Sequence, residues 1–179
     1  MVEARPVASE AELEQILELQ QRNLPRNLDE RERAEQGFVT VEHTLDVLRR
    51  MHAIVPSIVA KDDQELAGYA LVMPVECRSF VPVLDPMFRR LDANASLEGR
   101  RYYVMGQVCV AKPYRGRGVF SVLYAAHREN LKSRFDACVT EISVRNSRSL
   151  RAHEKAGFEE LERYRTATDE WIVVIWKWT

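Results

Sequence analysis

Residues 102–131 read YYVMGQVCVAKPYRGRGVFSVLYAAHRENL, and this stretch decides the fold. Its first part, Tyr103–Val110, is apolar with several valines, which predicts a buried strand that ends at Lys112-Pro113-Tyr114. Apolar residues then recur at helical spacing from Val119 to Leu131, which predicts an amphipathic helix. The segment between them, Arg115-Gly116-Arg117-Gly118, therefore forms a glycine turn where a strand hands over to a helix.

This glycine turn has the chemistry of an anion site. Gly116 and Gly118 allow positive φ and a close approach of a ligand to the backbone, so that successive N–H groups and the helix N-terminus converge on one point. Each favourable helix-end interaction contributes roughly 0.3–1 kcal/mol, so a multiply charged group such as a pyrophosphate exploits the turn better than a single carboxylate. A helix-capping turn without a ligand is the alternative interpretation of the same two glycines.

A second motif follows at Asn146–Phe158, which reads NSRSLRAHEKAGF and predicts a short helix with Asn at its start and Gly-Phe at its end. Together the two motifs resemble the GCN5-related N-acetyltransferase (GNAT) family over about residues 55–179. The phosphate-binding motif of that family is Arg/Gln-x-x-Gly-x-Gly/Ala, and its three defined places here hold Arg115, Gly118 and Phe120.

The second family motif has Asn, a small residue three positions on, usually Tyr seven positions on, and then Gly-Phe. These places hold Asn146, Ser149, His153 and Gly157-Phe158. Two departures from the family stand out. Phe120 replaces a small residue, and His153 replaces the usual tyrosine.

Composition bounds the class of protein. The 179 residues suit a single domain, 1–179, and 46% apolar with 30% charged residues are ordinary for a globular chain. A net charge of −1 gives no nucleic-acid footprint, and there is neither a signal peptide nor an apolar run near 18 residues that would suggest a membrane. Cys77, Cys109 and Cys138 read as reduced core residues, so we expect a cytoplasmic protein.

The rest of the chain predicts strands and helices around the central unit. Residues 22–36 read as a solvated loop or a short exposed helix, and within 76–100 a short helix is expected at Pro86–Leu91. The other expected elements are a strand at Val2–Val7, a helix after a capping box at Ser9–Glu12, a helix capped by Thr40, hairpin strands 56–61 and 66–75, a strand at 137–144, the Asn146 helix, and a hairpin of 158–166 and 170–178.

This order implies a mixed sheet with helices on both faces. The resemblance implies a GNAT-like, mostly antiparallel central sheet, an α/β fold that some schemes class as α+β.

The resemblance also implies an activity, acetyl transfer from acetyl-CoA to a primary amine by direct attack on the thioester. An amine with a pKa near 10.4 is neutral in only about one molecule in 2,500 at pH 7, so a base must take its proton. Glu141, five residues before Asn146, stands where some family members carry this base. A water chain as the base and a purely structural Glu141 are the alternatives. Gln107 stands where other members carry a glutamate, and its amide cannot accept the proton.

The leaving group poses the smaller problem, because a thiol with a pKa near 8.5 leaves with little help. His153, at the place of the family's tyrosine, is the candidate donor, either as imidazolium or from a neutral ring nitrogen. A structural histidine packed under the cofactor is the other interpretation.

Contacts to acetyl-CoA follow from the resemblance as well. The backbone of Val108, Cys109 and Val110 would pair with the pantetheine arm like an added strand. Asn146 would hydrogen-bond the arm. Three basic side chains near the turn, Arg115, Arg117 and Lys112, can neutralise the phosphates, and the alternative for any one of them is that it is simply solvated. The amides from Gly116 to Ser121 would hold the pyrophosphate, which makes Gly116, Arg117, Gly118, Val119, Phe120 and Ser121 the expected phosphate residues.

The expected acceptor is a small-molecule or peptide amine, without metal, nucleic acid or membrane, and a homodimer is left open. A non-catalytic acyl-CoA-binding or sensor domain of the same fold is the competing interpretation, favoured by the missing tyrosine and by Gln107. A kinase-like nucleotide loop is excluded, because no Gly-Lys-Ser/Thr follows the glycines.

Overall fold

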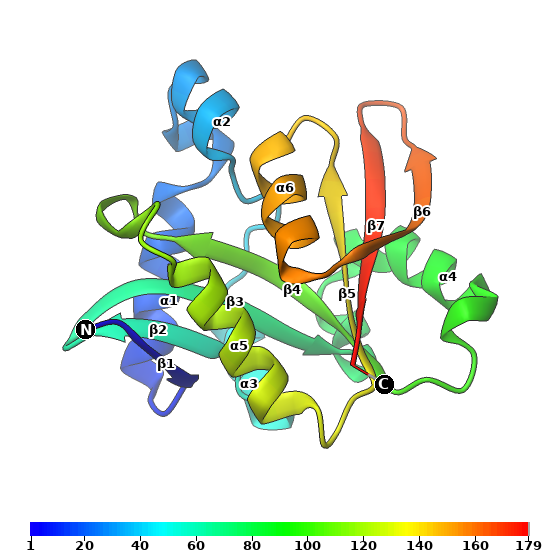
Figure 1. The fold of residues 1–179 in the computed structure, drawn as a ribbon, viewed down its shortest axis with the longest axis horizontal. Coiled ribbons are helices and arrows are strands. Elements are labelled where there is room, and N and C mark those ends of the chain that lie inside the picture. Colours follow the sequence, from blue (N-terminus) through cyan, green and yellow to red (C-terminus); the bar gives the residue numbers. More distant parts are fainter. Residues whose placement is uncertain (179) are drawn as a thin grey trace.

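The computed structural model describes residues 1–178, with the side chains of all of these except 34–36. In that part of the chain, seven strands form one sheet in the order β1-β2-β3-β4-β5-β7-β6 (Figure 1). All neighbouring strands are antiparallel except β4 and β5, which run parallel, so the expected mixed, mostly antiparallel sheet is confirmed. The strands are β1 (Glu3–Pro6), β2 (Ile58–Asp62), β3 (Glu65–Pro74), β4 (Tyr102–Val110), β5 (Ala137–Ser143), β6 (Glu159–Arg165) and β7 (Glu170–Lys177).

Helices cover both faces of the sheet, as expected. Figure 1 shows α5 and α6 in front of the strands, while α1 and α3 lie behind them. Each face has its own apolar core, because successive strand residues point to opposite sides; Val139 lies in the core shared with α1, α3 and α4, and Cys138 in the core shared with α5. The helices are α1 (Glu10–Arg22), α2 (Glu30–Gln36), α3 (Leu45–Ile54), α4 (Asp85–Ala93), α5 (Val119–Leu131) and α6 (Ser147–Ala156).

The predicted cap of one helix is wrong, and another helix begins where predicted but without the side-chain bonds of its capping box. The helix predicted to begin after Thr40 is α3, which begins at Leu45. It is capped by Thr44, whose hydroxyl accepts from Val47 N, so Thr40 does not cap it. Ser9 is the N-cap residue of α1 but makes no side-chain cap bond. Glu12 accepts from Ala8 N instead, because its carboxylate is drawn to Arg5. In both cases a tertiary contact or a neighbouring threonine outcompetes the local pattern.

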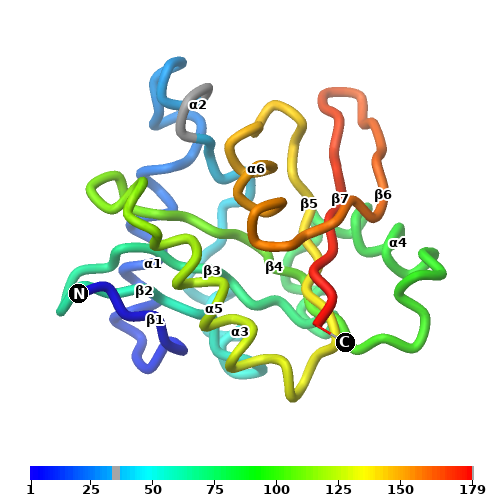
Figure 2. Tube along the Cα trace, in the orientation of Figure 1, coloured from blue at the N-terminus to red at the C-terminus, as the bar shows by residue number. Residues whose placement is uncertain are grey.

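The other expected elements form close to their predicted bounds. Pro86 lies in the first turn of α4, and Asn146 caps α6 by accepting from Ser149 N at 3.3 Å. Gly157 ends α6 with φ +98°, and Phe158 N donates to His153 O across it, a glycine C-cap. In the tube of Figure 2 the chain rises from α1 to α2, above β4 in this view, before it returns to α3.

The parallel strands β4 and β5 pair only at their N-terminal ends and then diverge. Their ladder is limited to Tyr102–Val104 and Ala137–Val139. Beyond it, β4 continues to Val110 and β5 to Ser143 without pairing with each other. The helix α5 crosses between them, as a parallel connection requires. At the fork, β4 also carries a bulge: Gly106 and Gln107 together oppose Leu71 of β3. The sheet therefore opens into a wedge beside a free edge of β4.

Candidate functional site

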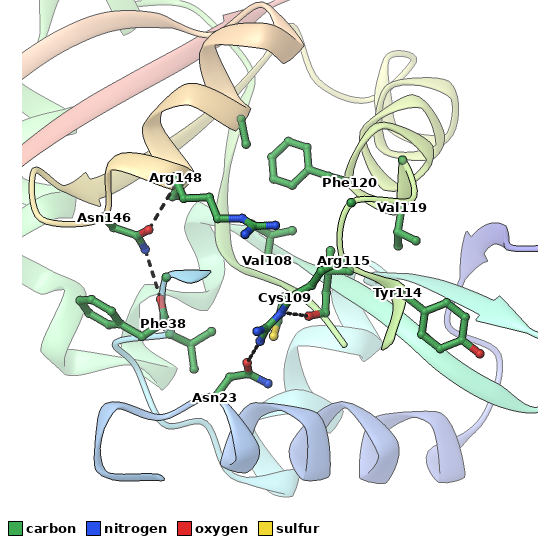
Figure 3. Close-up of a pocket in the computed structure, with 17 residues that line it drawn as sticks. Asn23, Phe38, Val108, Cys109, Tyr114, Arg115, Val119, Phe120, Asn146 and Arg148 are labelled. Carbon is green, nitrogen blue, oxygen red and sulfur yellow. Dashed lines mark hydrogen bonds between the residues drawn. The ribbon is translucent and has the colours of Figure 1, made fainter. Parts of the chain in front are cut away.

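A cavity of about 320 Å³ lies at the mouth of this wedge (Figure 3). It combines the glycine turn, the free edge of β4, the start of α6 and a segment before α3, residues that are far apart in the sequence. Its lining consists of Asn23, Gly37, Phe38, Val39, Val108, Cys109, Val110, Tyr114, Arg115, Gly116, Gly118, Val119, Phe120, Asn146, Arg148, Ser149 and Ala152. Most of the residues expected to hold a coenzyme thus meet in one cavity.

The glycine turn presents open backbone to this cavity. Gly116 and Gly118 have φ of +76° and +79°, and a Cβ added at either would meet no atom within 4 Å. Gly118 is the N-cap residue of α5 and offers no side chain to the first N–H groups of the helix, which have no intrahelical partner. The turn therefore has unpaired donors, a helix N-terminus and free space at one point, as an anion site requires.

A third glycine, on β3, lets α5 lie close to the sheet. A Cβ on Gly68 would come within 2.8 Å of Cys109 O and within 3.3 Å of side chains of Val119 and Leu123. The first turn of the helix packs into the space that this missing side chain leaves. The position of the glycine turn over β4 thus depends on a residue outside both motifs.

Arg115, the first residue of the phosphate motif, is tied into the protein. Its side chain is only 12% exposed, and its guanidinium donates to Val110 O at 3.2 Å and Asn23 Oδ1 at 2.6 Å and pairs with Glu32 at 3.0 Å. Lys112 reaches the same Glu32 carboxylate at 3.3 Å. A second cavity continues outward from here along Glu32, Lys112 and Arg115. The carboxylate of α2 thus lies between two of the cations expected to meet phosphates.

Residues 37–41, which we call the strap, run over the wedge and are hydrogen-bonded to β4 and to the N-cap residue of α6. Asn146 Nδ2 donates to Phe38 O at 3.3 Å, and Gln107 Nε2 donates to Val41 O at 2.7 Å. Gly37 fits closely, because a Cβ there would lie 2.6 Å from Asn146 Oδ1. Gln107 also accepts from the buried Tyr69 hydroxyl. It is a cross-link between β4, β3 and the strap.

Below the strap, a narrower cleft of about 70 Å³ leads between the parted strands. Glu141 of β5 lines it, and its carboxylate accepts a hydrogen bond from Tyr164 of β6 at 2.5 Å. Burial raises the pKa of Glu141 above its ordinary value, while the Tyr164 hydrogen bond and the charge of Arg90 oppose that rise. A carboxyl group with a raised pKa in a narrow cleft has the character of a general base.

His153 of α6 lines the same cleft but is 1% exposed as a residue. Its Nδ1 lies 2.8 Å from Ser149 O, an acceptor, so Nδ1 carries the proton. Nε2 then accepts from the Tyr124 hydroxyl at 2.6 Å. Burial lowers the pKa of His153 to about 4, so of the two forms considered from the sequence, the neutral ring rather than the imidazolium is the one favoured at pH 7. Tyr124 and Phe158 pack edge-on against the ring.

Glu141 and His153 approach the cleft from opposite faces of the sheet. Glu141 follows Val139 by two residues and so points to the side of α4, while His153 lies on α6 on the other side. Both line one cleft because the sheet is open between β4 and β5. Two reactants could therefore enter the cleft from opposite faces of the sheet and meet between β4 and β5.

The structure brings together most, but not all, of the predicted site residues. Arg117 and Ser121 do not line the main cavity; Arg117 lies over the Tyr114 ring at 6.0 Å, and Ser121 faces a groove between α5 and α6. Cys109 lines the cavity, and burial raises the pKa of its thiol to about 12. All three cysteines are free and buried, as expected.

Several lining residues were missed. Arg148 reaches from α6 into the cavity in Figure 3, and its place inside the second motif is a signal that could have found it. Asn23 and Phe38, which also line the cavity, and Tyr164, which contacts Glu141, belong to no motif, so no local pattern in the sequence marks them. Within residues 1–33 and 37–178, no group of His, Cys, Asp and Glu could hold a metal ion, and no described helix has the length and hydropathy to cross a membrane.

Comparisons with known proteins fit this geometry. The model of the Acetyltransferase (GNAT) family matches residues 13–158, and no curated protein matches the chain. Among solved structures, the chain is similar to one in the NatC complex bound to Gag peptide and CoA, with a TM-score of 0.67, 17% identity and 99% of each chain covered.

Two further solved structures share the fold at low identity. The ribosomal-protein-S18-alanine N-acetyltransferase from Escherichia coli gives a TM-score of 0.65 at 13% identity, covering 99% of this chain and 94% of that one. The yncA structure from Salmonella typhimurium with its cofactor acetyl-CoA gives 0.64 at 15% identity, covering 100% and 95%.

Proposed function

Since this chain belongs to the acetyltransferase (GNAT) family, we propose that it transfers the acetyl group of acetyl-CoA to a primary amine by direct attack of the amine on the thioester. The observation that carries the proposal is the continuous path from an open glycine turn, along the free edge of β4, to Glu141 in the cleft. Acetyl-CoA supplies the activated acetyl group. Neighbouring structures with CoA or acetyl-CoA support this choice.

The residues of the cavity suit that coenzyme. The N–H groups of Gly116 to Ser121 would hold the pyrophosphate, since the added-Cβ space in front of Gly116 and Gly118 is empty. The unpaired edge of β4 at Val108–Val110 would bind the pantetheine arm as an added strand does. Arg115 and Arg148 would contribute positive charge from either side of the cavity. The side chain of Arg117, outside the cavity, would act on the phosphates only through its charge.

Glu141 is the proposed base. It would take the proton of the acceptor's ammonium group on the α4 side of the sheet, so that the neutral amine attacks the thioester carbonyl presented from the α6 side. Its raised pKa supports the role, because a base close to the operating pH is the most effective. Cys109, the thiol nearest the coenzyme cavity, is a poor nucleophile, since its pKa of about 12 leaves little thiolate. This favours direct transfer over an acetyl-enzyme.

For His153 we propose a role through Ser149, whose hydroxyl would donate a hydrogen bond toward the leaving sulfur, rather than proton donation by the ring itself. Its Nδ1–H lies 3.3 Å from Ser149 Oγ as well as 2.8 Å from Ser149 O. Ser149 lines both the coenzyme cavity and the cleft, so its own O–H is free to point at the sulfur while His153 holds its oxygen. A thiol with a pKa near 8.5 needs no stronger help.

Peptide or protein amines are the first acceptors to test, because structural neighbours include a complex with a peptide and an enzyme named for a protein's alanine. Small amines are the second class. One domain over 1–179, a cytoplasmic location, the absence of metal, nucleic acid and membrane partners, and an open question of a homodimer remain predictions from the sequence.

The competing function is a non-catalytic acyl-CoA-binding or sensor domain. The observation that favours it is the engagement of both His153 nitrogens together with the structural use of Gln107. Release of CoA from acetyl-CoA, followed with a thiol reagent over a panel of peptides, polyamines, amino acids and antibiotics, separates the two. Turnover that Glu141→Gln abolishes supports the enzyme. Tight acetyl-CoA binding without turnover on any amine supports the sensor.

A further inference from the structure

Glu141 is held by a residue that belongs to neither motif. The Tyr164 hydroxyl donates to Glu141 Oε2 at 2.5 Å, and the Arg90 guanidinium lies over the Tyr164 ring at 4.1 Å from its centre. Arg90 is itself fixed by Glu162 at 2.8 Å. We propose that Tyr164 is a positioning residue that orients the Glu141 carboxylate toward the incoming amine, with Arg90 holding Tyr164 in place. This inference rests on the proposed function of Glu141 as the base.

The sheet explains how Tyr164 reaches Glu141. Glu141 pairs with Val173 of β7, while Tyr164 pairs with Trp171 on the far side of the same strand. The tyrosine side chain therefore passes over β7 to reach a carboxylate two strands away. α4 packs on this face of the sheet and supplies Arg90 from above, so that a helix, an edge strand and an inner strand meet at one carboxyl group.

A carboxylate bound through one oxygen has the other left for catalysis. In the described part of the chain, Oε2 accepts from Tyr164 and Oε1 has no hydrogen-bond partner. A fixed Oε2 also sets the torsion of the carboxyl group, which determines where Oε1 points. Losing the hydroxyl would free this torsion, and a base displaced by a fraction of an ångström abstracts a proton less efficiently.

The Tyr164 hydroxyl also affects the protonation of Glu141, together with the charges around it. The titratable and charged groups facing Glu141 are Tyr164 and Glu162 from β6, Arg90 from α4 and, across the cleft, neutral His153. Burial raises the Glu141 pKa, while the Tyr164 hydrogen bond and then the Arg90 charge lower it. Burial and the hydrogen bond to Glu141 raise the pKa of Tyr164 above its ordinary value, so the phenol remains a hydrogen-bond donor at neutral pH.

The test is Tyr164→Phe, which keeps the ring under Arg90 and removes only the hydroxyl. Tyr102→Phe is the matched control, because Tyr102 is a half-buried tyrosine at the start of β4. The Glu141 carboxyl is titrated by carbon NMR in the free protein, a readout that needs no acceptor. Acetyl transfer from acetyl-CoA to ethylamine, an amine small enough for the narrow cleft, is measured over the same pH range.

If the Tyr164 hydroxyl positions Glu141, the Tyr164→Phe variant has a higher Glu141 pKa, and the acid limb of its rate profile moves to higher pH. Its limiting rate falls roughly tenfold, which corresponds to the loss of one hydrogen bond to a charged group. The control variant changes neither quantity. An unchanged Glu141 titration in Tyr164→Phe overturns the inference. A shifted Glu141 titration with an unshifted rate profile shows that Tyr164 contacts Glu141 but that Glu141 is not the base. The failure of this inference is thereby distinguished from the failure of the proposed function.

Discussion

Replacing Gly118 by alanine separates the backbone strain of the glycine turn from its use as an anion site. Gly118 has φ +79°, a conformation that costs a residue with a Cβ roughly 1–2 kcal/mol. Gly99 is the matched control, because it has φ +72° and likewise no atom within 4 Å of an added Cβ, but lies outside the cavity. For a chain of this size, both variants should melt roughly 2–8 °C lower.

Only the variant at Gly118 should lose affinity for the coenzyme. Its methyl group would project into the empty space before the α5 N-terminus and remove one contact between an N–H group and a charged phosphate, worth about 1.5–3 kcal/mol. That corresponds to roughly a tenfold to hundredfold weaker Kd. Calorimetric titration with CoA at 25 °C measures it. If the variants at Gly118 and Gly99 bind CoA equally well, the phosphates are not held at this turn.

Three further outcomes are expected. His153→Ala should lower turnover roughly tenfold to a hundredfold, at the low end of general-acid effects, and His153→Tyr should recover part of it; a variant at full rate would leave His153 purely structural. Cys109 should carry no acetyl group by mass spectrometry after incubation with acetyl-CoA alone, and an adduct there would refute direct transfer. The hydrogen bond from Arg5 lowers the pKa of Glu12 from 4.5 to about 2, so its stabilising effect is complete above pH 4.5 and is lost as the pH falls through 2. Urea unfolding of Glu12→Gln should therefore show a deficit at pH 7 that closes near pH 2, and a deficit independent of pH would contradict this.

Features encoded by neighbouring residues were predictable from the sequence. The glycine turn, the Asn cap and the Gly157 cap each depend on a few consecutive residues, and the structure places all three as expected. The alternation of β5 likewise predicts that Glu141 and Val139 share a face. The GNAT resemblance rested on these local patterns, and the family match confirms it.

Contacts between distant segments were not predictable. Phe38 meets Asn146, and Arg90 meets Tyr164, only because the sheet order brings their elements together. The same holds for His153, whose Nε2 accepts a hydrogen bond from Tyr124 on another helix. The sequence offers two threonines four residues apart, Thr40 and Thr44, as the cap of α3. Local propensity does not distinguish them, and in the structure the cap is Thr44.

The short ladder between β4 and β5 has a consequence for how the native state opens. In the described chain, three residue pairs, Tyr102–Val104 with Ala137–Val139, join a half-sheet made from residues 3–110 to another made from 137–177. Each half is contiguous in sequence and antiparallel throughout, so each is able to unfold locally as a cooperative unit. Amide hydrogen exchange should then show two levels of protection. If CoA binds to β4 and to Asn146 as proposed, it should slow exchange in both halves, because it would form a second connection between them.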